Sequence, residues 1–181
     1  MRNQETDRRR GAPVDDQAAA SAGSRLRLWQ VLLARQPRSI PQGARNQVIV
    51  VDSSVWIDFL KGSHAPHVRQ LRSALGSAEI IVGDLMLCEV LQGLESERAA
   101  REVEALLRRF EIAEMAGDVI AVAAARNFRS LRNRGVTVRK TIDLLIGTWC
   151  IENRVRLLHN DNDFRPMARY LGLMEVKAGT S

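Results

Sequence analysis

Two kinds of hydrophobic pattern alternate along the chain from residue 47 onwards. Short runs rich in β-branched residues, such as QVIVV at 47–51 and EIIV at 79–82, are typical of strands buried on both faces of a parallel sheet. Between them, apolar residues recur at helical spacing. Strands are predicted at 47–51, 79–82, 111–115, 156–159 and 173–176, and helices at 55–61, 64–75, 84–91, 95–110, 118–134, 141–153 and 163–171. This alternation predicts an α/β fold with a mostly parallel sheet.

Residues 1–46 differ in composition from the rest of the chain. They contain three of the five prolines, an Arg triplet, and one stretch, LRLWQVLL at 26–33, that could form a short amphipathic helix. We interpret this segment as a disordered basic extension. An arm that contacts RNA and a mis-assigned start upstream of the native one are the alternatives. The folded domain is therefore expected at 47–181.

Charge and cysteine content narrow the class of protein. Of the net charge of +6, residues 1–46 contribute +5, from nine Arg and four acidic residues, and residues 47–181 contribute only +1. The high pI is therefore no argument that the domain binds nucleic acid. Cys88 and Cys150 lie in apolar helical patterns and are expected to be buried thiols rather than zinc ligands. Because there is no secretory signal and no apolar run of the ~20 residues needed to span a bilayer, we expect a cytoplasmic protein without membrane contact.

Four acidic residues map to one edge of the predicted sheet. Asp52 and Asp161 follow two of the predicted strands, Asp143 opens a helix, and Glu89 lies in the helix after the second strand. Ligands of open parallel α/β sheets gather beyond the C-terminal ends of the strands. We therefore expect these four side chains to lie close together.

Glu89 and Asp143 carry the sharper signal, because each interrupts an apolar helical stretch (LMLCEVL and TIDLLIGTWC) that contains no Arg or Lys. A buried carboxylate is costly unless it is paired or bound to a cation. Acids that converge without basic partners repel one another, and a divalent cation relieves that repulsion. An all-carboxylate site suits Mg²⁺ or Mn²⁺. Such a site could activate water for attack on a phosphodiester.

Each acid also has a purely structural interpretation. Asp52 can cap the helix that follows it, and Asp143 can complement the dipole at a helix N-terminus. Asp161 lies in a turn, where Asp is common, and Asp163 is expected to cap the last helix. Glu89 can face solvent. Only their shared location distinguishes a functional site from these ordinary roles.

Four segments of the chain together form a recognisable pattern: VIVVDSSVWIDFL (48–60), GDLMLCEVLQGL (83–94), RGVTVRKTIDLLIGTWC (134–150) and RLLHNDNDF (156–164). In order, spacing and local context they resemble the PIN domain, and closely the VapC-like toxins of type II toxin–antitoxin modules. The resemblance covers 48–176 and none of residues 1–46. It implies a three-layer α/β/α PIN-like fold and a Mg²⁺-dependent endoribonuclease that acts as the toxin of a toxin–antitoxin pair. It also implies an RNA substrate, a homodimer and a small cognate antitoxin that occupies the active site.

The resemblance assigns roles to individual residues. The catalytic and metal-binding residues it implies are Asp52, Glu89, Asp143 and Asp161. The polar positions it implies near the metal are Ser54, Thr141 and Asp163. The sequence departs from the family at Asn162, where a basic residue is often found, and in the extension 1–46, which is atypical and puts the true start in doubt.

Basic residues just before the Asp143 helix are the candidates for contacts to RNA phosphates. They are Arg132, Arg134, Arg139 and Lys140. Their alternative role is to complement the C-terminal dipole of a helix.

Other classes of protein with acids at strand ends fit less well. A phosphatase of the haloacid dehalogenase type needs a second Asp where Ser54 stands, and a receiver domain needs an adjacent acid pair and a late Lys. A catalytically idle PIN-like protein that binds RNA or acts as a scaffold is the alternative function.

Overall fold

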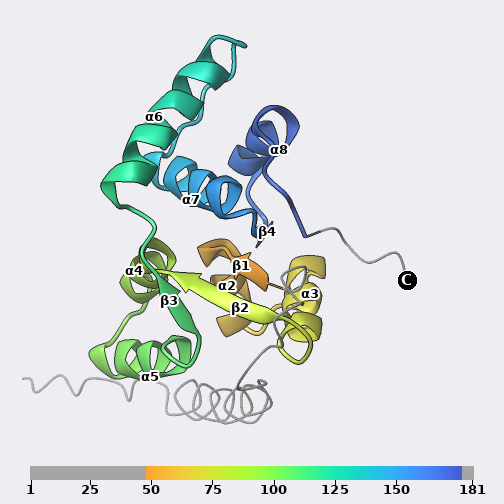
Figure 1. Cartoon of the computed structure of the whole chain (residues 1–181). Coiled ribbons are helices and arrows are strands. Elements are labelled where there is room, and N and C mark those ends of the chain that lie inside the picture. Colours follow the sequence, from red (N-terminus) through yellow and green to blue (C-terminus); the bar gives the residue numbers. More distant parts are fainter. Residues whose placement is uncertain (1–47, 177–181) are drawn as a thin grey trace, which may run out of the picture. The chain divides into compact units, whose positions relative to one another are not determined.

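The structure, a computed structural model, describes residues 48–176 (Figure 1). The predicted extension 1–46 therefore lies outside the described residues. The strands are β1 (Val48–Val51), β2 (Glu79–Gly83), β3 (Glu111–Ala113) and β4 (Arg156–Leu158). The helices are α2 (Ser53–Leu60), α3 (Pro66–Ala74), α4 (Asp84–Gln92), α5 (Glu97–Leu107), α6 (Asp118–Arg132), α7 (Thr141–Asn153) and α8 (Arg165–Leu171), with a 3-10 helix, η2 (Asn162–Phe164), before α8. Across 48–176, no helix combines the length and the apolar content needed to cross a membrane.

The four strands form one parallel sheet in the order β3-β2-β1-β4. Strand β1 lies between β2 and β4, with Val50 in register with Ile81 on one side and with Leu157 on the other. Because neighbouring strands run in the same direction, β1 and β4 end at the same edge of the sheet. The residues that follow β1 and β4 are therefore neighbours in space although more than a hundred positions separate them in the sequence.

Helices cover both faces of this sheet, as the buried, β-branched strand sequences predicted. Val50, Ile81 and Leu157 pack in a core with apolar residues of α6, α7 and α8. Ile49 and Val51 are also buried, and the alternation of side chains along a strand directs them to the opposite face. In Figure 1, α6, α7 and α8 lie together above the strands. The other helices form a second group, in which α2 packs against α3 and α4, and α4 packs against α5. The three-layer α/β/α fold is confirmed.

Two local predictions were wrong. The last predicted strand, 173–176, forms only a single parallel bridge, between Leu157 and Glu175. Cys88 is exposed, whereas Cys150 is buried as predicted. The apolar pattern around Cys88 misled the prediction because only part of α4 faces the core, with Met86 and Val90 buried.

Helix α7 packs very closely against α8 at Gly147, one turn after Asp143. A Cβ atom at Gly147 would lie 2.5 Å from Cε of Met167 in α8, which is fully buried. The lack of a side chain at Gly147 therefore sets how near α7 lies to the segment that follows β4.

Candidate active site

Asp52 stands at the C-terminal end of β1 and begins α2. Its backbone N–H donates to the carbonyl of Leu158 at the end of β4, at 2.9 Å. Its side chain is buried, and Oδ2 accepts hydrogen bonds from the backbone N–H of Ser54 at 3.0 Å and from the Ser54 hydroxyl at 2.5 Å. Ser54 Oγ also accepts from the backbone N–H of Asn160, at 3.4 Å. Asp52 therefore caps α2 while it stands at the predicted edge of the sheet.

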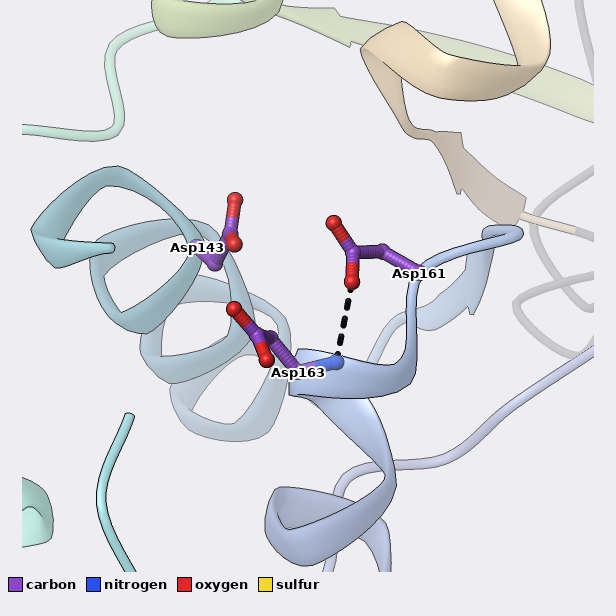
Figure 2. Close-up of side chains that lie close together, drawn as sticks. All are labelled: Asp143, Asp161 and Asp163. Carbon is purple, nitrogen blue, oxygen red and sulfur yellow. Dashed lines mark hydrogen bonds between the residues drawn. The ribbon is translucent and has the colours of Figure 1, made fainter. Parts of the chain in front are cut away.

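Asp161 and Asp163 lie in the segment that follows β4. Asp161 begins η2, and its Oδ1 accepts from the backbone N–H of Asp163 at 3.0 Å (Figure 2). The prediction that Asp163 caps the last helix was wrong, because Asp161 takes the capping role in η2 and α8 begins after Phe164. The carboxylate of Asp163 is thus left to face the other acids.

Asp143 lies in the first turn of α7, and its side chain projects toward Asp161 and Asp163 (Figure 2). One carboxylate oxygen from each of these three residues lies within 4.8 Å of the others, close enough to hold one metal ion. Asp143 is only 4% exposed. Its Oδ2 is buried, and none of residues 48–176 gives it a hydrogen bond. The structure therefore brings together Asp143, Asp161 and Asp163, all three of which the sequence placed at or near the metal.

Glu89 is half-buried on α4, so the interpretation that it faces solvent is wrong. Its Oε2 is buried and, within the described part of the chain, has no hydrogen-bond partner. Asp52 and Glu89 are not in the tight group of three carboxylates, but their negative charges still act on Asp143. Thr141 is the exposed first residue of α7, two positions before Asp143.

Sequence reasoning missed a basic partner of the acids, Lys140. Its Nζ donates a hydrogen bond of 2.8 Å to Oδ2 of Asp161 and lies 3.6 Å from Oδ2 of Asp143. The expectation that the acids converge without basic partners was therefore wrong. A signal existed in the sequence, because residues three apart at the start of a helix share a face, as Lys140 and Asp143 do.

The carboxylates of the site differ in their affinity for protons. Burial raises the pKa of Asp143 to about 6; the charge of Lys140 opposes this rise, and the charges of Asp52, Asp161 and Glu89 add to it. The hydrogen bond from Lys140 lowers the pKa of Asp161 below its ordinary value, and the backbone N–H of Asp163 lowers it further. Of these two acids, Asp143 is therefore the one whose negative charge is less well compensated.

The other basic residues predicted to contact RNA are exposed at the end of α6 and in the segment between α6 and α7. Arg134 is held by hydrogen bonds from its Nη1 to the carbonyl and the hydroxyl of Ser130, and it lies over the ring of Tyr170. Arg132 lies over the ring of Phe128, on its own helix. Arg139 is exposed next to Lys140. These exposed basic residues lie close in sequence to the acidic residue Asp143.

Known proteins with similar sequences are ribonucleases by name. The chain is 27% identical over 128 residues to the VapC ribonuclease Mb1587 of Mycobacterium bovis, a match that covers 70% of this chain and 96% of that protein. It is equally similar to the ribonuclease VapC11 of Mycobacterium tuberculosis. The matches thus cover nearly the whole length of these relatives.

Solved structures with the same fold come from VapBC complexes. VapBC2 from Rickettsia felis, solved with a DNA fragment from its promoter, contains a chain that superposes with a TM-score of 0.58 at 16% identity, covering 71% of this chain and 97% of that one. VapBC-1 from nontypeable Haemophilus influenzae gives a TM-score of 0.57, also at 16% identity, covering 72% and 97%. At such low identity these likenesses show the fold alone.

The family assignment rests on the sequence as a whole. The model of the PIN domain family matches residues 49–170, which include all of β1 except its first residue, all four predicted acids and the whole of α7. The chain belongs to the PIN domain family.

Proposed function

We propose that this chain is a metal-dependent endoribonuclease, the toxin of a toxin–antitoxin pair, which hydrolyses RNA with Mg²⁺ or Mn²⁺ bound to its acidic cluster. The observation that carries the proposal is the meeting of Asp143, Asp161 and Asp163 at the C-terminal edge of a parallel sheet, with their carboxylate oxygens within 4.8 Å. Similarity to curated VapC ribonucleases supports the choice of RNA as the substrate.

The residues present fit a hard divalent cation. Every candidate ligand is a carboxylate, the ligand type that Mg²⁺ and Mn²⁺ prefer over thiolate or imidazole. The buried Oδ2 of Asp143 accepts no hydrogen bond from any described residue, and a buried charged oxygen in that state is costly. Asp143, Asp161 and Asp163 would hold the ion, because their carboxylate oxygens converge. Asp52, which Ser54 orients, and Glu89 are further candidates, since their charges also act on Asp143. When bound, the ion would polarise the phosphodiester and the attacking water.

Glu89 is the better candidate for the general base. Both oxygens of Asp161 are already engaged, Oδ1 by the N–H of Asp163 and Oδ2 by Lys140. Glu89 Oε2, in contrast, is free of hydrogen bonds from residues 48–176, so it can accept a proton from the attacking water. Water oxygen then bonds to phosphorus, the bond from phosphorus to the 3′-oxygen breaks, and that oxygen takes up a proton. The products carry 5′-phosphate and 3′-hydroxyl ends.

The partners we propose are an RNA, a small antitoxin and a second copy of the chain. The structural neighbours that share the fold were solved as VapBC assemblies, which supports an antitoxin partner. The gene for that antitoxin is expected beside the gene for this chain, as a small upstream reading frame. The same observation would locate the native first residue and so decide whether residues 1–46 belong to the protein.

Metal removal tests the proposed activity. The full 181-residue chain is expected to cleave RNA in Mg²⁺ or Mn²⁺ and to lose this activity in EDTA, with recovery when the metal is restored. The ends of the products are determined by phosphatase and kinase labelling. Asp52→Asn separates the activity from a contaminating nuclease, because it removes a ligand charge but keeps the shape of the side chain.

Two results would contradict this proposal. A 2′,3′-cyclic phosphate product would show that the 2′-hydroxyl, not water, attacks the phosphorus. A folded wild-type chain that cleaves no RNA with either metal would favour the idle RNA-binding or scaffold protein.

A further inference from the structure

Lys140 contacts the group of acidic residues that would bind the metal under the proposed function. It is the residue before α7, and its side chain crosses to the segment after β4, where Nζ meets Oδ2 of Asp161 at 2.8 Å. The same Nζ is 3.6 Å from Oδ2 of Asp143. One ammonium group therefore touches two of the carboxylates that converge in Figure 2.

The ammonium group compensates the acids only in part. Three carboxylates within 4.8 Å repel one another, and Lys140 supplies a single positive charge. Its hydrogen bond goes to Asp161, while its 3.6 Å separation from Asp143 is too long for one. A divalent cation would compensate the negative charges of Asp143 and Asp161 more completely than one ammonium group does.

A divalent ion and the Lys140 ammonium compete for the same oxygens. Two positive charges that share one carboxylate oxygen repel each other strongly at such short distances. The side chain of Lys140 is 57% exposed, so it has room to leave. Its four-carbon stem is flexible, and an ammonium is readily hydrated once it reaches water.

We propose that Lys140 is a tethered counter-ion, which holds Asp161 and Asp143 together in the metal-free chain and is displaced when the divalent ion binds. The inference rests on the proposed metal site. Once displaced, Lys140 stands at the edge of the active site, where its charge can meet the phosphates of the substrate. The metal-free chain is thus stabilised by the same residue that weakens its affinity for the metal.

Metal affinity measured without any RNA tests this competition. Lys140→Met keeps much of the apolar stem but removes the charge, so we expect the Kd for Mn²⁺, measured by calorimetry on the full chain, to fall about 10-fold. Arg139→Met is the matched control, because it removes the same charge from the adjacent, exposed residue. The Kd of the Arg139→Met variant for Mn²⁺ is expected to stay much closer to that of the wild type. An unchanged or higher Kd in Lys140→Met overturns the inference, while a wild-type chain that binds no Mn²⁺ overturns the metal site and the inference together.

A second measurement uses the wild-type chain, so it does not depend on the folding of a variant. The sequence contains only three lysines, Lys61, Lys140 and Lys177, so acetylation of each can be followed separately by mass spectrometry. Addition of Mg²⁺ is expected to increase the acetylation of Lys140 relative to that of Lys61, because the ion-paired amine is released. If metal that binds measurably leaves the ratio unchanged or lowers it, Lys140 stays on the acids and the inference fails, whereas the proposed ribonuclease survives.

Discussion

The starts of helices α2 and α7 use the same residue type in opposite ways. Asp52, at the start of α2, is 3% exposed, and Asp143, in the first turn of α7, is 4% exposed. Oδ2 of Asp52 accepts two hydrogen bonds from Ser54. Oδ2 of Asp143 accepts none from residues 48–176, and its positive neighbour, Lys140, lies 3.6 Å away.

The difference teaches how to separate a structural acid from a functional one. Local hydrogen bonds stabilise the charge of Asp52, so that residue contributes to folding as well as to the proposed site. The environment of Asp143 opposes its charge, and a fold tolerates such a group when it serves another purpose. Burial alone does not distinguish the two residues, since it is almost equal; the hydrogen bonds do.

The largest expected effect concerns catalysis at the start of α7. Asp143→Asn keeps the shape of the side chain but removes the charge that would bind the metal, so we expect RNA cleavage in Mg²⁺ to slow by at least about 100-fold. Asp118→Asn is a matched control, because Asp118 also lies in the first turn of a helix, α6, but is exposed. It should cleave at the wild-type rate. If Asp143→Asn and Asp118→Asn cleaved RNA at comparable rates, Asp143 would not be part of the active site.

The second prediction concerns the free energy of unfolding of the same variant, Asp143→Asn. Removing this buried charge is expected to stabilise the metal-free chain. The pKa of Asp143 rises from 3.8 to about 6 on folding, so folding favours the protonated acid. The protonated carboxyl group of Asp143 contributes its full stabilisation to the fold below pH 3.8, and this contribution is lost as the pH rises toward 6. In EDTA, Asp143→Asn should therefore gain up to about 3 kcal/mol over the wild type across this window.

Urea unfolding of both proteins at a series of pH values measures that gain. The difference should grow from about pH 4 to about pH 6 and then stay constant, because the acid is fully ionised above its pKa. Added Mg²⁺ should reduce the difference by stabilising the wild type alone. A difference that does not depend on pH would mean that the charge of Asp143 is already compensated.

The smallest effect is expected at the start of α2, where the acid is also a cap. Asp52→Ala should lower the free energy of unfolding by about 1 kcal/mol, whereas Asp52→Asn should lower it much less, because an amide oxygen can still accept from Ser54. Both variants should lose RNA cleavage. Urea unfolding in EDTA separates the two roles, and equal stabilities for the Ala and Asn variants would show that the cap contributes nothing.

The sequence predicted the positions of the two acids that follow strands. Asp52 and Asp161 each follow a short apolar run, and a buried parallel strand places the next residue at the edge of the sheet whatever the details of packing. The apolar surroundings of Asp143 likewise predicted its burial. These inferences depend on local pattern and on a topology with few alternatives, so they were accurate.

The predictions that failed depended on side-chain contacts that no local pattern specifies. Asp161 and Asp163 are both good capping residues, and which of them begins η2 follows from how the chain leaves β4. The contact between Lys140 and Asp161 joins residues 21 positions apart. Residues 173–176 have a strand-like composition, but pairing with β4 is limited to one bridge. The assignment of 1–46 as a separate segment stays a prediction.

In the proposed metal site, the close contact at Gly147 would affect the spacing of the ligands although Gly147 is not one of them. Asp143 comes from α7, while Asp161 and Asp163 come from the segment that leads into α8, and no covalent link fixes the gap between them. That gap depends on the volume enclosed between Gly147 and Met167. Exchanges of one methyl or methylene group in this apolar contact, one turn from Asp143, would therefore change the separation between the proposed metal ligands of α7 and those of the segment before α8.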